Sequence, residues 1–124
     1  MIIKIPFKTP SVNSMYAYFR GHRIKSKESR ELAKEVKKIV DNSKTEQIDG
    51  KLKVTIKVAS NWHNKDGSIK KKDISNLEKF ITDSIFSALP NMDDKQIFKI
   101  GMDKFQSETD YSIVTIEKLD GKDS

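Results

Sequence analysis

The sequence contains no cysteine, three prolines, five glycines and one tryptophan among its 124 residues. The absence of cysteine excludes a disulfide framework and thiolate metal sites. No apolar run approaches the roughly 18 residues of a membrane-spanning helix, and the opening MIIKIPFK is too short for a signal-peptide core. We therefore expect a cytoplasmic protein with one domain at residues 1–119 and a disordered tail at 120–124.

Arginine is also scarce, since only three of the 24 basic side chains are arginine. The net charge of +6 favours a polyanionic partner, although charge alone reports solubility and non-specific binding. Lysine presents a point charge suited to phosphate, whereas arginine provides the fork that reads guanine edges. Most contacts are therefore expected to position a nucleic-acid backbone rather than to read bases.

Hydrophobic periodicity predicts the element order β-α-β-α-β-β. Strands are predicted around residues 3–7, 51–58, 96–105 and 111–118. The strand at 51–58 alternates strictly, which is typical of a half-buried antiparallel strand, and the third strand places Phe98, Ile100 and Met102 on one face. Helices are predicted from Ser26 to about Asp41 and over about 76–89, with polar loops at 9–23 and 61–72. This order predicts an α+β fold, with two main helices on one side of a mixed sheet.

Carboxylates gather around the second predicted helix. Asp73 lies at its entrance, and Asp93 and Asp94 lie just past its end. Carboxylates that come together repel one another unless they share a proton or a cation. Hard oxygen ligands of this type suit Mg²⁺ or Mn²⁺, which hold a phosphate and activate a water for in-line attack.

The same helix has a polar face. If it begins near Asn76, then Asn76, Lys79 and Asp83 fall on one side beside the apolar stripe. A lysine at this place is suited to stabilise charge that builds up on a phosphate. Asp83 lies one turn after Lys79, however, and an ion pair between them is the favoured interpretation of that aspartate.

Each acidic residue also has a purely structural interpretation. Asp73 is equally typical of a solvated loop residue that answers the lysines before it. The Asp93-Asp94 pair is typical of a polar turn before a strand. Ser75 and Glu78 match the S-x-x-E capping box, which predicts a helix that begins at Ser75 for structural reasons alone. Spacing does not decide between these interpretations.

A family resemblance covers the same residues. The segment DISNLEK from Asp73, then Asp83, then DDKQI from Asp93 resembles the D-x-D-N-x-x-K…D…DD-x-Q pattern of RusA-family Holliday-junction resolvases. The segments PSVN at 10–13, RGHR at 20–23 and SKE at 26–28 resemble the opening of the same family. The likeness spans roughly residues 6–117, in the right order and spacing.

The resemblance implies a homodimeric, Mg²⁺-dependent endonuclease, with Mn²⁺ as an alternative ion, that cleaves four-way DNA junctions in recombination and repair. It implies no small-molecule cofactor and no membrane partner. The family's catalytic acidic cluster includes the positions of Asp73 and Asp94, and its catalytic lysine matches Lys79. Asp93 is expected to be a further metal ligand. Supporting roles are expected for Ser75, Asn76 and Asp83.

The chain departs from the family pattern at Ser75, where the pattern has a second aspartate. A hydroxyl is a neutral and weaker ligand, so the site loses one negative charge. Asp93 or the carbonyl oxygen of Asn76 are candidate replacements. Two alternatives to an active resolvase therefore stay open. One is a catalytically weakened protein that binds branched DNA, and the other is a metal nuclease for flaps or RNA.

Basic and aromatic side chains surround these motifs. The expected DNA-binding residues are Asn13, Arg20, Arg23, Lys25, Lys27, Lys70, Lys71 and Lys72. Beside a phosphodiester-cleaving site such runs are interpreted as backbone clamps, although charge runs alone usually mark a solvated surface. Tyr16, Tyr18 and Phe19 are suited either to stack on exposed bases or to pack at a dimer interface. Trp62 and His63 are expected in the core or at its rim, and neither His22 nor His63 has the spacing of a metal ligand.

Overall fold

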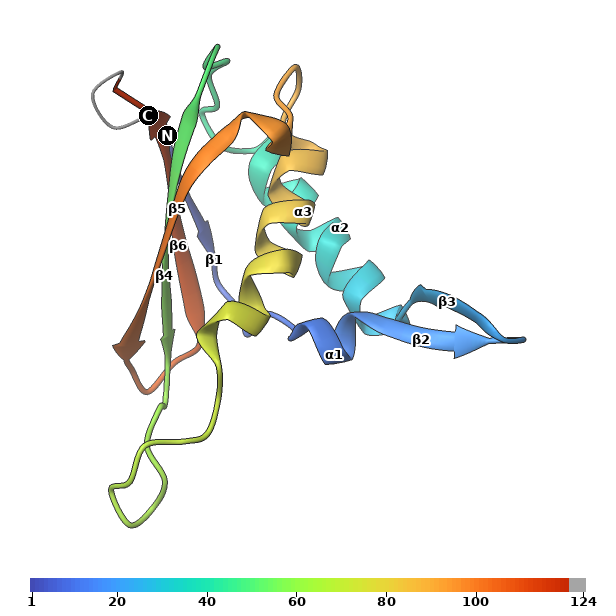
Figure 1. Cartoon of the computed structure of the whole chain (residues 1–124), viewed down its shortest axis with the longest axis vertical. Coiled ribbons are helices and arrows are strands. Elements are labelled where there is room, and N and C mark those ends of the chain that lie inside the picture. The colour runs from blue at the N-terminus through green and yellow to red at the C-terminus, as the bar shows by residue number, and fades with distance from the viewer. Residues whose placement is uncertain (121–124) are drawn as a thin grey trace.

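The structure is a computed structural model that describes residues 1–120, so the predicted tail lies outside the described residues except for Asp120. The main sheet contains β1 (Ile2–Ile5), β4 (Leu52–Ser60), β5 (Ile97–Gln106) and β6 (Tyr111–Lys118). Helices α2 (Lys27–Asp41) and α3 (Glu78–Ala88) lie together on one side of it (Figure 1). The shorter elements are the helix α1 (Val12–Met15), the strands β2 (Tyr16–Phe19) and β3 (His22–Lys25), and the 3-10 helices η1 (Ile74–Leu77) and η2 (Asp94–Gln96).

The strand order in the main sheet is β1-β6-β4-β5. The central strand β4 runs antiparallel to β6 and parallel to β5, so the sheet is mixed. The predicted α+β class with two main helices on one side is therefore confirmed. The antiparallel character predicted for residues 51–58 holds for one of the two neighbours of β4.

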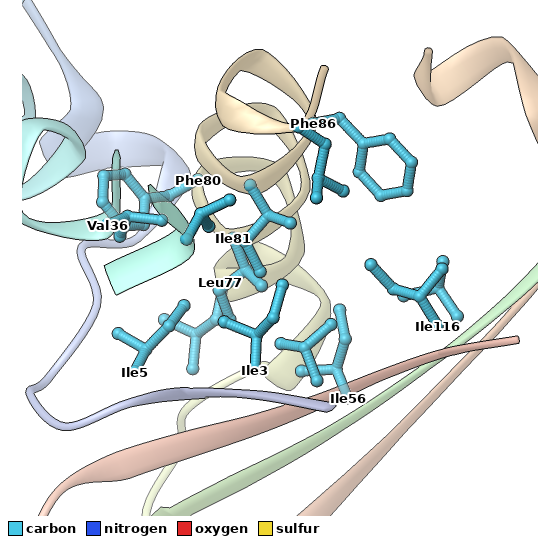
Figure 2. Close-up of a cluster of buried hydrophobic side chains, with 14 of the residues drawn as sticks. Ile3, Ile5, Val36, Ile56, Leu77, Phe80, Ile81, Phe86 and Ile116 are labelled. Atoms are coloured by element: carbon cyan, nitrogen blue, oxygen red, sulfur yellow. The ribbon is translucent and has the colours of Figure 1, made fainter. Parts of the chain in front are cut away.

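One hydrophobic core lies between the sheet and the two helices. The inward face of β4, with Val54 and Ile56, is fully buried because it faces the helices, whereas the alternate residue Lys57 is exposed. Ile81 of α3 and Val36 of α2 have exposed fractions of 0% and fill the space above the strands. Figure 2 shows these side chains converging with Ile3, Ile5 and Ile116 from the sheet. This burial fixes the position of α3 over the sheet.

Strand β5 is an edge strand with a poorly covered apolar face. Of the three residues predicted on one face, only Met102 packs against the core, whereas Phe98 is 60% exposed and Ile100 is 41% exposed. The main packing partners of β5 are β4 and η1 rather than α3. The helices therefore leave most of this strand open to solvent.

The segment before α3 differs from the prediction. The helix expected from about residue 76 begins at Glu78 and is preceded by η1. The capping box predicted from Ser75 and Glu78 is wrong, because the hydroxyl of Ser75 donates a hydrogen bond to Asp73 instead. Asp73 is the actual N-cap of η1, since its side chain accepts from the backbone N–H of Ser75. The start predicted for the first helix is confirmed, with Ser26 as the N-cap of α2.

The polar loop predicted at 9–23 is wrong, since this segment forms α1 and most of an antiparallel hairpin. Arg20 and Gly21 form its two-residue turn, with φ values of 51° and 79°. Positive φ at both central positions is the geometry of a type I′ turn, for which Asn-Gly and Asp-Gly are the usual sequences. The hairpin was not predicted because this chain has Arg-Gly in place of these usual sequences.

Candidate acidic site and its basic surroundings

Asp93 and Asp94 are held by a capping motif between α3 and β5. The backbone N–H of Asp93 donates to Oε1 of Gln96 over 2.8 Å, and Oδ1 of Asp93 accepts from the backbone N–H of Lys95 over 2.9 Å. The Gln96 amide also donates to the carbonyl oxygens of Ile48 and Gly50 over 3.1 and 3.0 Å. This polar turn is therefore anchored to the segment before β4, and both carboxylates are presented on the surface.

The two aspartates influence each other's protonation. A side-chain hydrogen bond to Asp93, together with the negative charges of Asp93 and Asp83, raises the pKa of Asp94 above its usual value. The backbone N–H of Lys95 and the hydrogen bond from Asp94 lower the pKa of Asp93. The pair therefore holds a proton on Asp94 more readily than an isolated aspartate does.

Asp83 and Lys79 form the middle of the site. Nζ of Lys79 lies 3.3 Å from Oδ2 of Asp83, which confirms the predicted ion pair. The hydrogen bond to Asp83 raises the pKa of Lys79, so the lysine stays charged. Both residues line a groove between α3 and β5 that also contains Asp94 and Phe98. A second groove joins Asp83, Asp93 and Asp94 to Lys25.

Asp73 lies at the other end of α3. Its Oδ1 accepts hydrogen bonds from the backbone N–H and the hydroxyl of Ser75, over 3.0 and 2.8 Å. These two bonds lower the pKa of Asp73, with a smaller contribution from the charge of Lys104. Ser75 therefore orients the carboxylate of Asp73, and the backbone N–H of Asn76 donates to the Asp73 carbonyl oxygen over 3.2 Å.

One chain does not gather the whole predicted ligand set. Asp83, Asp93 and Asp94 share a groove, but Asp73 lines neither of the two acidic grooves. The eleven residues of α3 separate the two ends by about 16 Å along the helix axis. Within residues 1–120, no three carboxylate or imidazole side chains are grouped so that they could hold a metal ion. The described part of one chain therefore brings Asp93 and Asp94 into a groove without Asp73.

The predicted basic residues fall in two regions. The hairpin of β2 and β3 exposes Arg20, Arg23 and Lys25, and Asn13 and Lys27 are exposed near its base. The loop after β4 carries Lys70, Lys71 and Lys72 toward Asp73.

Lys8 and Lys104 also lie near these motifs, and they were not singled out from the sequence. Burial and the neighbouring charge of Lys8 lower the pKa of Lys72, so these two residues form a pair of like charges beside each other. Nζ of Lys104 lies 4.9 Å from the centre of the Trp62 ring, and its charge acts on Asp73. These contacts join distant parts of the chain, and for that reason local sequence patterns gave no signal for Lys8 or Lys104.

Trp62 lies in the core as predicted, whereas His63 is exposed and forms its contact at the surface. Trp62 is buried, and its Nε1 donates to the carbonyl oxygen of Phe105 over 3.1 Å. Nδ1 of His63 is 2.8 Å from Oε1 of Gln106. Both side chains therefore tie the loop after β4 to the end of β5.

The fold, the acidic grooves and the lysine-rich surface define a small basic α+β protein that is suited to act on a phosphate backbone. The family profile described as Endodeoxyribonuclease RusA matches residues 6–117, which is most of the chain. The chain therefore belongs to the RusA family of endodeoxyribonucleases. Membership implies an endonuclease that resolves Holliday junctions and binds branched DNA. No curated protein matches the chain. Across residues 1–120, no helix is long and apolar enough to cross a membrane.

Proposed function

We propose that this protein binds four-way DNA junctions as a homodimer and resolves them by paired, Mg²⁺-dependent cleavage in recombination and repair, with Mn²⁺ as an alternative ion. The family match over residues 6–117 carries the proposal. It is supported by the acidic side chains at both ends of α3 and by the charged Lys79 between them. Paired nicks across a four-way junction require two like-oriented sites, which a two-fold dimer supplies.

Each proposed residue has a distinct role. Asp73, Asp93 and Asp94 supply carboxylate oxygens for the cation, whose chemistry when bound is to hold a phosphate and lower the pKa of a water. Lys79 keeps a positive charge near the phosphate to be cut, and its ion pair with Asp83 sets the position of the ammonium group. Ser75 and Asn76 hold the Asp73 turn in place.

Strand β5 supports a dimer through its open edge. It is ten residues long, has a strand neighbour on one side only and exposes the apolar residues Phe98 and Ile100. A long edge strand with exposed apolar residues is a template for pairing with another strand. We therefore propose that two copies pair through β5 in antiparallel orientation.

This pairing also addresses the incomplete ligand set. In an antiparallel pair about a two-fold axis, the Ile97 end of one β5 lies beside the Gln106 end of the other. Asp94 precedes the first end, and Lys104, whose charge acts on Asp73, is close to the second end. Asp94 of one copy would thus approach Asp73 of the other copy, twice in the dimer. In this arrangement the cation needs both chains.

The activity is tested with a synthetic four-way junction and a linear duplex of the same sequence, each titrated with Mg²⁺. We expect paired nicks in the junction and little cutting of the duplex. Equal cleavage of both, or of neither at any Mg²⁺ or Mn²⁺ concentration, would contradict the proposal. Flap and RNA substrates at the same salt concentration distinguish a resolvase from another nuclease, because affinities fall steeply with ionic strength.

The dimer is tested by sedimentation equilibrium of the Ile100→Glu variant. The side chain is already 41% exposed, so the monomer tolerates the charge, and we expect loss of both dimer and cleavage. Ile2→Glu is the matched control, because Ile2 is 68% exposed on β1 at the opposite edge of the sheet. An Ile100→Glu protein that remains an active dimer would exclude the β5 interface.

A catalytically weakened junction-binding protein is the second candidate, and Ser75 is the observation that favours it. The position that carries a carboxylate in the family pattern here carries a hydroxyl that donates to Asp73. Ser75→Asp separates the two candidates. A large gain in cleavage with unchanged junction affinity would show that the natural protein is impaired. Unchanged cleavage would show that the site does not need a carboxylate at position 75.

A further inference from the structure

The hairpin of β2 and β3, residues Tyr16–Lys25, forms an arm that projects away from the two layers (Figure 1). It forms a two-stranded sheet of its own and pairs with no strand of the main sheet. Tyr18 is 79% exposed, Phe19 is 58% exposed and Ile24 is 43% exposed. Large apolar groups on an arm that adds little to the core need a partner to explain them.

The pairing register places aromatic groups on both faces of the arm. Tyr18 is opposite Arg23, and Phe19 is opposite His22, so adjacent residues point to opposite sides. The guanidinium of Arg23 lies 4.3 Å from the centre of the Tyr16 ring, and that of Arg20 lies 5.2 Å from the Phe19 ring. Each face thus combines an exposed aromatic ring with a cation.

Charge and turn geometry identify the class of partner. Residues 15–27 carry four arginines or lysines and no aspartate or glutamate. Arg20 occupies the first central position of the turn with a φ of 51°, a conformation that glycine and asparagine adopt more readily. The tip therefore carries a guanidinium at a position where a different residue would form the turn with less strain. This pattern complements a polyanion that also has exposed aromatic surfaces.

The base of the arm lies beside the acidic site. Lys25, at the end of β3, lines the groove that contains Asp83, Asp93 and Asp94. Tyr16, its partner across the hairpin, is near enough to Lys79 to contribute to the raised pKa of that lysine. The arm is also fixed to α2, because Ser29 Oγ donates to the Met15 carbonyl oxygen over 2.8 Å. A nucleic acid that contacts the arm is therefore held next to the groove.

We propose that the arm is a branch-recognition element that stacks Tyr18 and Phe19 on nucleobases left without a stacking neighbour at a DNA branch point. Arg20 and Arg23 contact the flanking phosphates. One ring on each face suits insertion between two separated base pairs. The inference rests on the proposed function for its DNA partner, and it assigns the discrimination between branched and linear DNA to these residues rather than to the acidic site.

Binding is measured in EDTA, so that the result does not depend on cleavage. We expect Phe19→Ala and Tyr18→Ala each to weaken junction binding about five- to a hundredfold, and to change binding of a linear duplex much less. Phe19→Leu should lose most of the affinity, because it keeps apolar bulk but has no ring face, whereas Phe19→Trp should retain it. The matched control is Ile2→Ala, since Ile2 is also a large exposed apolar residue but lies on β1.

The tip is tested with Arg20→Asn, which retains a favourable type I′ turn and removes the guanidinium. We expect junction affinity to fall and the slope of log affinity against log salt to decrease by about one phosphate contact. Unchanged affinity and slope would remove Arg20 from the proposal. A junction with 5-iodouracil at the branch, irradiated with the wild-type protein, should cross-link to the peptide that contains Tyr18 and Phe19.

Two results would overturn the arm's role. One is equal loss of junction and duplex binding in Phe19→Ala, which would mean general adhesion rather than branch recognition. The other is unchanged junction affinity with a change in the sedimentation mass of the DNA-free protein, which would make the arm a contact between copies. A wild-type protein that binds the junction well but never cuts it would count against the nuclease and leave the arm supported.

Discussion

At the scale of single residues, Ser75 shows how a departure from a family pattern is accommodated. Its backbone N–H and hydroxyl both donate to one oxygen of Asp73. Two hydrogen bonds to a carboxylate favour the charged form, and for that reason they lower the pKa of Asp73. Ser75 brings no carboxylate of its own to this position, but its two hydrogen bonds keep Asp73 ionised and oriented.

Asp73 has a structural and a proposed catalytic role, and two substitutions separate them. Asn caps a helix about as well as Asp, so Asp73→Asn should leave the unfolding midpoint unchanged, whereas Asp73→Ala should lower it. Both should reduce junction cleavage about a hundredfold or more, since both remove the charge. Thermal unfolding and single-turnover cleavage are the measurements. An active Asp73→Asn protein would leave the residue with a capping role only.

Ser29 is one of the residues that fix the base of the arm to α2. It is 3% exposed, and its hydroxyl donates to the carbonyl oxygens of Met15 and Ser26 over 2.8 and 3.0 Å. Ser29→Ala removes one of two donors to the Met15 carbonyl oxygen, which keeps its hydrogen bond from the backbone N–H of Ser26 over 2.8 Å. We therefore expect a loss of about 0.5–1.5 kcal/mol in the free energy of unfolding. Urea denaturation measures it. Ser87→Ala is the control, because Ser87 is exposed on α3 and its change should have almost no effect.

At the scale of elements, the loop between β4 and η1 owes its shape to its own polar groups. The backbone N–H and hydroxyl of Ser68 donate to Oδ1 of Asp66, and the hydroxyl bond is the main cause of the lowered pKa of Asp66. His63 and Ile69 form an isolated bridge at the base of the same loop. The loop positions the lysines that precede Asp73.

The lowered pKa of Asp66 gives the loop a pH dependence of known sign. Since the folded value lies below the unfolded one, the stabilisation is present above the usual pKa of an aspartate and is lost as pH falls through the lowered value. Ser68→Ala should move the Asp66 pKa back toward 3.8 and increase amide exchange in this loop at neutral pH. Carboxyl NMR titration reads the first effect. An unshifted pKa in the variant would rule out the hydroxyl as its cause.

At the scale of the whole molecule, the net charge is +6, and the lysines differ in whether a neighbouring carboxylate neutralises them. Several lysines of α2 are matched by acids on the same helix, as in the pairs Lys37–Asp41 at 2.9 Å and Lys38–Glu35 at 3.2 Å. Among the lysines that lead to Asp73, burial lowers the pKa of Lys72, and the like charges of Lys8 and Lys70 lower it further. The second group has more to gain from binding phosphate.

This difference predicts which lysines contribute to DNA affinity. Lys70→Gln with Lys71→Gln should weaken junction and duplex binding alike, and should lower the salt slope by about two phosphate contacts. Lys37→Gln with Lys38→Gln removes the same charge and should change the slope much less, because both lysines already face carboxylates. Binding at several salt concentrations decides this. Equal effects of the two double variants would show that only net charge matters.

The sequence alone determined the two-layer arrangement, because periodicity states which face of each strand and helix is apolar. The alternation at 51–58 and the helical spacing from Leu32 to Val40 were sufficient for β4 and α2. The spacing of the acidic motifs around Asp73 and Asp93 indicated the family, and the match over residues 6–117 confirmed it. Apolar periodicity and motif spacing are local properties of the chain, and for that reason the sequence alone predicts what depends on them.

Only the tertiary structure decided how the chemistry is distributed. It separated Asp73 from the two grooves that contain Asp94, left the edge of β5 open and extended the Arg-Gly hairpin as an arm. It also brought Lys8 to Lys72 and Lys104 to Asp73, across long stretches of chain. Sheet order and helix packing set these distances, and no local pattern encodes them.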